Sequence, residues 1–218
     1  MTILITGANR GIGRAMFDGY RSRGDAVIGT TRGAAPDEGL WEQLEVSDPT
    51  SQAALAGRLG GQPLDLLVCN AGVYPDKGNA LEDGYPAQMW ADAFATNVTG
   101  VFLTIQSLLP NLRTAENAKI AIISSQMASH QHAPGGSYIY RASKAAVLNL
   151  GRNLSKDLEA EGIAVGIYHP GWVRTDMGGA GGDIEVDQAR DGLMARFDAL
   201  SMANTGCFET WDGNTPPY

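Results

Sequence analysis

The chain has 218 residues, of which 44% are hydrophobic and 18% charged, and these values are typical of one globular domain. Twenty-four acidic and sixteen basic residues give a formal charge of −8, which argues against nucleic acids and anionic membrane surfaces as partners. Cys69 and Cys207 form no CxxC pair, and the first residues carry no signal-peptide pattern, so we expect reduced thiols and a cytoplasmic protein.

Short apolar runs alternate with longer helical segments along the chain. Strands are expected at residues 2–6, 26–31, 64–69, 118–124 and 163–168, with an edge strand at 207–211. Helices are expected from residue 11 to about 23 and at about 87–109 and 140–159. Apolar strands separated by helices indicate a parallel sheet with helices on both faces. We therefore predict a single α/β domain over residues 1–218, a doubly wound Rossmann-type sheet.

The first expected strand runs into Thr6-Gly7-Ala8-Asn9-Arg10-Gly11-Ile12-Gly13, where a helix begins. Glycines permit the tight turn and let backbone amides approach a pyrophosphate, while a helix N-terminus favours negative charge. The spacing is Gly-x3-Gly-x-Gly rather than the usual Gly-x-Gly-x2-Gly. Such a turn alone could be a plain strand–helix connection, but its place at the first β–α junction favours a dinucleotide site.

This loop resembles the glycine motif of the short-chain dehydrogenase/reductase family. Cys69-Asn70-Ala71-Gly72 is similar to the family's Asn-Asn-Ala-Gly, with Cys69 in place of the first Asn, so that any hydrogen bond of that side chain is lost. The resemblance covers essentially the whole chain. It is greatest to the subgroup of C-factor and sniffer-type carbonyl reductases, through residues 169–179 and the Trp211-Asp212-Gly213 turn.

The end of the second expected strand bears on the choice of nicotinamide cofactor. NAD-specific family members have an acid where this chain has Thr31, and Arg32 follows. A guanidinium there can pair with a 2′-phosphate, as can Arg10 of the glycine loop, so NADP(H) is preferred over NAD(H). The alternative is that both are surface arginines. Glu45 and Val46 resemble the family's Asp-Val pair beside adenine, with glutamate as a departure.

Tyr140-Arg141-Ala142-Ser143-Lys144 places Tyr140 and Lys144 four residues apart at the start of an expected helix, and so on one face. The ammonium of Lys144 and the positive charge of an oxidised nicotinamide would favour the phenolate, so we expect the pKa of Tyr140 to be lowered. Tyr140 could then donate a proton to a developing alkoxide. An incidental Tyr and Lys on one helix face is the alternative.

The family resemblance implies two further catalytic residues. Ser125, at the end of the strand expected at 118–124, matches the serine that holds the substrate oxygen, although Ser124 and Ser129 stay open as alternatives. Asn97 matches the fourth member of the group, and the resemblance implies a local helix distortion there, whose freed carbonyl binds a water that links Lys144 to solvent. The expected catalytic set is Asn97, Ser125, Tyr140 and Lys144.

His169-Pro170-Gly171-Trp172-Val173-Arg174-Thr175 resembles the family turn at the nicotinamide end of the cofactor, and His169 is expected to be structural. The resemblance thus implies a cofactor-binding set of Gly7, Asn9, Arg10, Gly11, Ile12, Gly13, Arg32, Glu45, Val46, Asn70, Ala71, Gly72, Tyr140, Lys144, Pro170, Gly171, Val173 and Thr175.

Two glycine-rich stretches, residues 134–137 and 178–183, are expected to be mobile loops. Because 178–183 replaces the longer helical lid of many family members, we expect an open, weakly selective site. His130, His132 and Tyr138 would line its rim, or are simply exposed. No His/Cys/Asp cluster has metal-ligand spacing, so no catalytic metal is expected.

Together these observations predict an NADPH-dependent reductase of an aldehyde or ketone, with Tyr140 as general acid. A signalling protein of the C-factor type that binds NAD(P) with incidental turnover is one alternative, and an alcohol dehydrogenase working in the oxidising direction is another. The substrate, the direction and the oligomeric state stay open. Family members often pair through the helices near 90–110 and 140–160, which leaves a homo-oligomer as an option.

Overall fold

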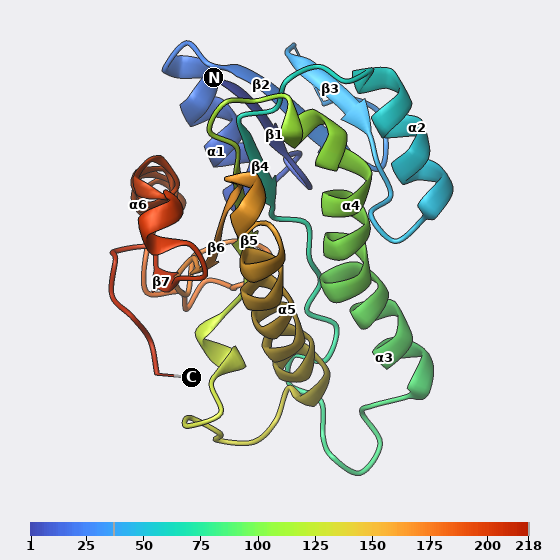
Figure 1. Ribbon diagram of the computed structural model, residues 1–218. Coiled ribbons are helices and arrows are strands. Elements are labelled where there is room, and N and C mark those ends of the chain that lie inside the picture. The colour runs from blue at the N-terminus through green and yellow to red at the C-terminus, as the bar shows by residue number, and fades with distance from the viewer. Residues whose placement is uncertain (37, 218) are drawn as a thin grey trace.

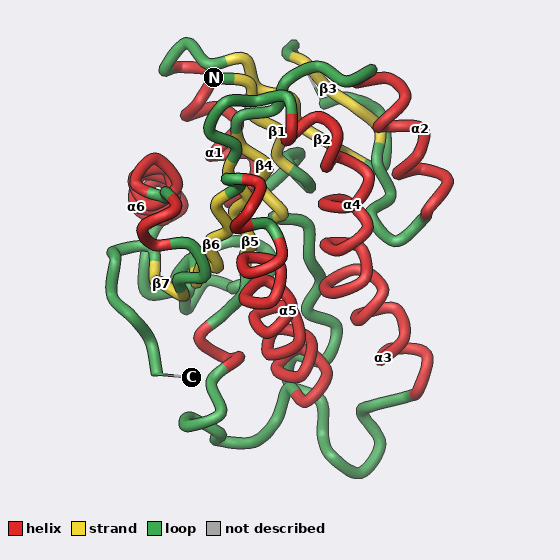
Figure 2. Tube along the Cα trace, viewed as in Figure 1, coloured by secondary structure: helices red, strands yellow, loops and turns green. Residues whose placement is uncertain are grey.

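A computed structural model describes residues 1–36 and 38–217, so Asp37 and Tyr218 of the expected domain 1–218 lie outside the described residues. The described part forms one seven-stranded sheet in the order β3-β2-β1-β4-β5-β6-β7, and every pairing is parallel (Figure 1, Figure 2). The strands are β1 (Thr2–Ile5), β2 (Ala26–Thr31), β3 (Leu40–Gln43), β4 (Leu66–Cys69), β5 (Lys119–Ile123), β6 (Ala164–His169) and β7 (Phe208–Thr210).

Helices cover both faces of this sheet, which confirms the doubly wound single-domain prediction. The helices are α1 (Gly11–Ser22), α2 (Pro49–Leu59), α3 (Ala87–Phe94), α4 (Gly100–Arg113), α5 (Tyr138–Asp157) and α6 (Val186–Ala199). Helices α1 and α6 pack together on one face, while α2, α4 and α5 lie on the other (Figure 1).

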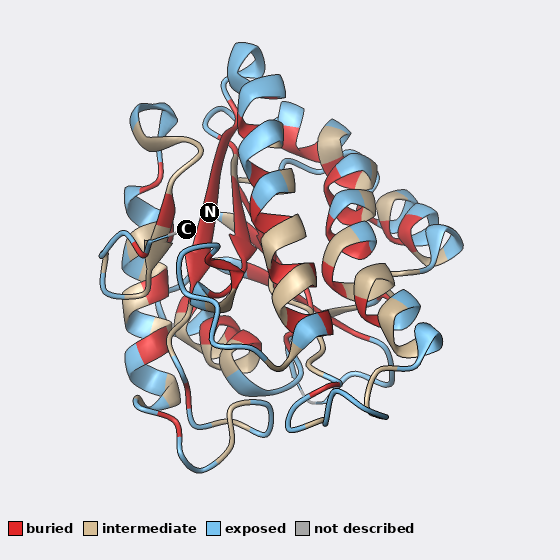
Figure 3. Cartoon of the chain, turned by 90° about the horizontal axis from the view of Figure 1, so that it is seen from below, coloured by how far each residue is buried: buried red, intermediate tan, exposed pale blue. Residues whose placement is uncertain are grey.

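Alternate strand residues feed the two halves of the core, as the two-residue period of a strand requires. In β1, Ile3 and Ile5 point toward α1 and α6, and Leu4 points toward α2 and α4. The strands are therefore buried on both faces, and the helices are exposed only along their outer sides (Figure 3). This explains why the strands are apolar throughout rather than alternating.

The expected strands agree with the observed ones to within two residues at each end, and the edge strand near 207–211 is confirmed as β7. The helix expected at 87–109 differs in that a π-helical turn, Ala95–Thr99, divides it into α3 and α4. By length and apolar composition the stretch Ala87–Arg113 would also suit a membrane span. Its contacts with α2, α5, β4 and β5 account for that apolarity within the fold.

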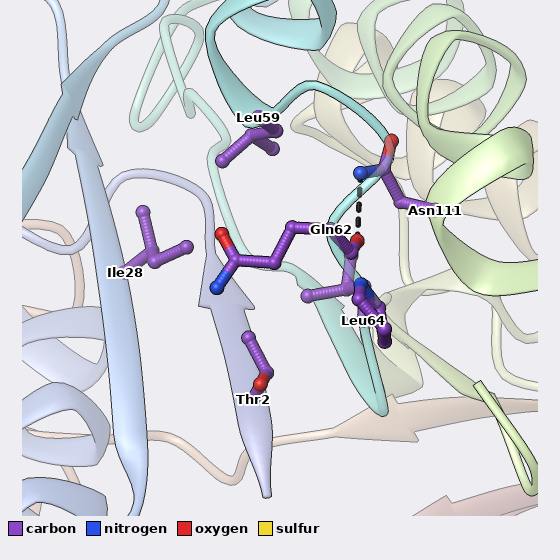
Figure 4. A pocket seen from close by; sticks show the side chains of 7 residues that line it. Thr2, Ile28, Leu59, Gln62, Leu64 and Asn111 are labelled. Carbon is purple, nitrogen blue, oxygen red and sulfur yellow. Dashed lines mark hydrogen bonds between the residues drawn. The ribbon is translucent and has the colours of Figure 1, made fainter. Parts of the chain in front are cut away.

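The carboxyl and amino ends of the strands differ as places for a ligand. Open α/β sheets bind ligands at the carboxyl ends of the strands, where neighbouring connections run to opposite faces, here between β1 and β4. At the amino ends of the strands, a shallow hollow beside Thr2, Ile28 and Leu59 is partly filled by the Gln62 side chain and has no room for a water molecule (Figure 4). An adjoining hollow that also reaches Trp41 and Arg58 has a volume of about 170 Å³. The glycine loop follows the carboxyl end of β1, so the candidate site is placed at the carboxyl ends of the strands.

Candidate active site

The glycine loop between β1 and α1 has the backbone that a phosphate cradle needs. Gly7 and Gly11 have φ of 63° and 56°, in the region that favours glycine. A Cβ on Gly13 would lie 2.4 Å from the Asn70 Nδ2 and from the Gly7 oxygen, so no larger residue fits there. Arg10, the N-cap residue of α1, makes no side-chain cap hydrogen bond, so the first-turn amides can bind an anion.

Asn70 and Thr6 join this loop to the end of β4. The Asn70 Nδ2 donates to the backbone oxygens of Thr6 and Gly7 at 2.9 and 3.2 Å, and the Thr6 Oγ1 accepts from the backbone amides of Asn70 and Ala71. Thr6 was not among the expected site residues, although its position directly before Gly7 was a usable signal. The replacement at Cys69 leaves these contacts intact, because Cys69 is buried in the core.

The expected 2′-phosphate region lies at the protein surface. Thr31 is buried, whereas the Arg32 side chain is 74% exposed, with its Nη1 3.8 Å from the Glu45 Oε2. Arg10 lies apart from this pair, with its Nη1 3.7 Å from the Asp176 Oδ2. Exposed pairs at such distances contribute little, so both guanidinium groups are available to a stronger anionic partner.

The remaining expected cofactor residues lie outside the carboxyl ends of the strands, a region that we call the cofactor crevice because open α/β sheets bind their ligands there. A Cβ on Gly7 would lie 3.1 Å from the Ala71 Cα, and one on Gly11 would lie 3.7 Å from the Thr175 Cγ2. A Cβ on Gly72 would lie 3.3 Å from the Asn97 Oδ1 and 3.6 Å from the Lys144 Nζ. The remaining expected cofactor residues lie in the glycine loop and first turn of α1 (Asn9, Ile12), after β3 (Val46) and after β6 (Pro170, Gly171, Val173).

Tyr140 and Lys144 lie one turn apart on α5 and are both buried. The Lys144 Nζ is 5.6 Å from the centre of the Tyr140 ring and donates to the Ile123 oxygen at 2.9 Å. The phenol ring stacks on Tyr74, with ring centres 4.0 Å apart. Helix α5 is thus held against the end of β5 and the loop after β4.

The direction of the Tyr140 pKa shift differs from the prediction. The pKa of Tyr140 is raised to about 12. Burial is the main cause, a hydrogen bond with Ser125 acts in the opposite direction, and Tyr74 adds to the increase. Burial also lowers the pKa of Lys144 to about 8. The expected lowering of the phenol pKa was wrong for the protein alone, because desolvation outweighs any attraction from Lys144.

The structure separates the three serines that the sequence left as alternatives. The Ser124 Oγ donates to the Lys144 backbone oxygen at 2.9 Å, and the Ser129 Oγ accepts from the His132 amide at 3.1 Å. Ser125 is the serine whose hydroxyl interacts with the Tyr140 phenol, and it also caps a short turn through the Met127 amide. The preference for Ser125 stays a prediction, and the engagement of Ser124 and Ser129 elsewhere supports it.

Asn97 lies inside the π-helical turn between α3 and α4, which confirms the expected helix distortion. Its Nδ2 donates to the Val73 oxygen at 2.9 Å and to the Ser143 Oγ at 3.0 Å, and its Oδ1 accepts from the Val73 amide at 2.8 Å. Both donor hydrogens and one acceptor position of the side chain are thereby taken by protein groups. Its direct effect is to tie the loop after β4 to α5.

Hydrogen bonds hold the segment after β6 in place. Residues 178–183 form hydrogen-bonded turns, with the Asp183 amide bonded to the Trp172 oxygen at 2.7 Å and the Gly179 amide to the Thr175 oxygen at 2.7 Å. The Lys77 Nζ donates to the Met177 and Gly178 oxygens, so this segment is also held from the loop after β4. The expected mobility of 178–183 stays a prediction.

The residues expected around the site differ in their exposure to solvent. His130, His132 and Tyr138 are exposed, as either expectation required. His169 is buried, and its backbone oxygen accepts from the Trp211 amide. Among the described residues, no group of three or more His, Cys, Asp or Glu side chains could hold a metal ion.

Besides Thr6, two further site neighbours were missed by the sequence analysis. Tyr74 stacks on Tyr140, and the buried Asp76 carboxylate binds the first-turn amides of α5. Neither follows from a spacing rule, because each contact joins residues more than sixty positions apart.

The chain matches the family described as short chain dehydrogenase over residues 1–183, and it belongs to that family. Among its relatives, the C-signal protein of Myxococcus xanthus is 36% identical over 157 residues, which cover 72% of this chain and 93% of that protein.

Two solved structures have the same fold over the full chain. The NADPH-bound carbonyl reductase from chicken fatty liver is 31% identical with a TM-score of 0.90, and the match covers 100% of this chain and 98% of that one. The carbonyl reductase Sniffer of D. melanogaster is 26% identical with a TM-score of 0.92, covering 100% and 99%. The family and subgroup resemblance is therefore confirmed, and the protein is an oxidoreductase of the short-chain dehydrogenase family.

Proposed function

We propose that this protein uses NADPH to reduce the carbonyl group of an aldehyde or ketone, with Tyr140 as the general acid. The observation that carries the proposal is the position of Tyr140, which lies between Ser125 and Tyr74 and one helical turn from Lys144. This group lies at one end of the crevice that begins at the glycine loop. Carbonyl reduction needs a proton donor at that place.

The crevice suits a dinucleotide. The uncapped α1 N-terminus and the loop that excludes a Cβ at Gly13 would hold the pyrophosphate, while Asn70–Gly72 and the turn at 170–175 would line the rest. When bound, NADPH supplies the hydride. The exposed Arg32 supports NADPH over NADH, because a guanidinium can bind a 2′-phosphate with two hydrogen bonds. The NADPH in the chicken carbonyl reductase structure adds support.

The chain's own residues would handle the carbonyl oxygen. The Ser125 hydroxyl would donate a hydrogen bond to it, and Tyr140 would give it a proton, a contribution of about 10²–10⁴-fold in rate. With a pKa of about 12, the phenol is protonated at neutral pH. That state is the one that a general acid in carbonyl reduction needs at the start of the reaction.

A signalling protein that binds NAD(P) is the second candidate, and the similarity to C-signal is the observation that favours it. A panel of aldehydes, ketones and quinones distinguishes the two candidates. Each compound is incubated with the protein and NADPH, and NADPH consumption is followed at the nicotinamide absorbance band. NADPH binding is measured in a separate experiment. Our proposal predicts NADPH consumption with at least one carbonyl class. Tight NADPH binding with no consumption across the panel would instead support the signalling protein.

A further inference from the structure

Asp76 lies in the loop after β4, and none of its surface is exposed. Its Oδ2 accepts a hydrogen bond from the Ile139 amide at 2.7 Å. The Tyr140 amide lies 3.3 Å from Oδ1 and 3.4 Å from Oδ2. These are the second and third residues of α5, whose amides are normally satisfied by an N-cap side chain directly before the helix.

The residue in the N-cap position does not provide this cap. Ser137 has φ of 50°, a left-handed conformation that is strained for a residue other than glycine, and its side chain makes no cap hydrogen bond. Its hydroxyl is instead 2.6 Å from the Tyr74 hydroxyl. The cap of α5 therefore comes from 63 residues earlier in the chain.

Burying a carboxylate is costly unless it is well hydrogen-bonded. Here the amides of Ile139 and Tyr140 and the positive end of a 20-residue helix offset that cost. A serine or aspartate at position 137 in an ordinary N-cap conformation would bind the first-turn amides of α5 without burying a carboxylate. The placement of Asp76 therefore fits a geometric role as well as a stabilising one.

The loop that carries Asp76 also touches the cofactor crevice and the π-helical turn. Asn70 binds the glycine loop, and Val73 binds Asn97 through both of its backbone polar groups. Residues 70–76 thus fix the glycine loop, the turn that contains Asn97 and the first turn of α5 relative to one another.

We propose that Asp76 is a positioning residue for Tyr140. By binding the Tyr140 amide and the amide before it, Asp76 sets the position of the phenol relative to the cofactor crevice. The inference rests on the proposed function, in which Tyr140 is the acid. A misplacement of about 1 Å at such a group can cost about 100-fold in rate.

The test compares Asp76→Ala and Asp76→Asn in the full chain, with Asp83→Asn as a control that removes the charge of an exposed aspartate in the same connection. Asp76→Ala removes the acceptor, so kcat should fall about 10- to 100-fold, with KM for the carbonyl and Kd for NADPH within about twofold. Asparagine caps helices about as well as aspartate, so Asp76→Asn should recover kcat to within about threefold of wild type.

Rates are measured at a temperature where circular dichroism shows every variant folded. An unchanged kcat in folded Asp76→Ala would overturn the inference and leave a purely stabilising cap. If Asp76→Ala does not fold, Asp76→Glu takes its place, because the added methylene keeps the charge but displaces the helix end. A wild-type kcat in Asp76→Glu would then overturn the inference.

The two proposals fail in different ways. If the wild type reduces no carbonyl, the proposed function fails. The claim that Asp76 fixes the first turn of α5 is then tested by amide hydrogen exchange. Exchange at Ile139 and Tyr140 should be faster in Asp76→Ala than in wild type. Equal exchange in the two proteins would contradict the claim.

Discussion

Lys144 donates a hydrogen bond from its Nζ to the backbone oxygen of Ile123 at 2.9 Å, which anchors the ammonium to the carboxyl end of β5. The same strand end is bound a second time, because the Ser124 hydroxyl donates to the Lys144 backbone oxygen. Lys144 is 5% exposed, and burial lowers its pKa to about 8. The charge beside Tyr140 therefore titrates close to physiological pH.

We expect this titration to shape the pH profile of reduction. Tyr140 stays protonated up to a pKa of about 12, so the loss of the Lys144 proton comes first as pH rises. The value of kcat/KM for reduction should therefore fall above about pH 8. Lys144→Arg keeps the charge and should lack this alkaline decline, whatever its overall rate. A wild-type profile that is flat from pH 7 to pH 9.5 (roughly the range in which Lys144 would lose its proton) would contradict the assignment.

A second pH effect concerns stability. His169 is buried, burial lowers its pKa to about 4, and its Nδ1 has no hydrogen-bond partner among the described residues. The unfolded chain binds a proton at His169 near pH 6.5 and the folded chain only near pH 4. The contribution of neutral His169 to the free energy of unfolding is therefore complete above pH 6.5 and is lost as pH falls toward 4.

Between pH 7 and pH 5 the loss from His169 should be about 2 kcal/mol of unfolding free energy. Urea unfolding at both pH values measures it, and His169→Gln serves as the matched protein because it shares every other titrating group. The fall in stability should be about 2 kcal/mol smaller in the variant. Equal pH dependence in the two proteins would show that His169 is not buried in the neutral form.

Cofactor choice is tested at Arg32. Hydrogen bonds to a charged group contribute about 1.5–3 kcal/mol, so Arg32→Ala should raise Kd for NADPH about 10- to 100-fold and leave Kd for NADH within about threefold. Arg58→Ala, which removes an exposed arginine paired with Glu42 away from the crevice, is the control. An equal loss for both cofactors would dismiss the 2′-phosphate contact.

The sheet could be predicted because its inner strands are buried on both faces and so are apolar throughout. Strand β3 (Leu40–Gln43) was missed because it lies at the sheet edge, is four residues long and is half-exposed or exposed. Helix α6 was missed although Ala189, Leu193 and Phe197 recur every four residues and are its buried face. Helix α2 also had a usable signal, since Asp48-Pro49 caps its start.

The site could be predicted where its chemistry is local in sequence. The glycine loop and the spacing of Tyr140 and Lys144 are short-range patterns, and both lie near the carboxyl ends of the strands. Asp76 and Tyr74 act across more than sixty residues, so no local pattern indicates them. The pKa of Tyr140 was misjudged for a related reason: the dominant effect is burial by several distant segments, whereas the sequence displays only the neighbouring lysine.

The claim that Tyr140 is the general acid is tested most directly by Tyr140→Phe, with Tyr85→Phe as a control that removes a phenolic hydroxyl elsewhere. The Phe ring keeps the stacking on Tyr74 and removes only the proton donor. We predict that NADPH consumption falls about 10²–10⁴-fold while NADPH binding, followed by nucleotide fluorescence, changes by less than about twofold. Carbonyl reduction by Tyr140→Phe at close to the wild-type rate would contradict the account.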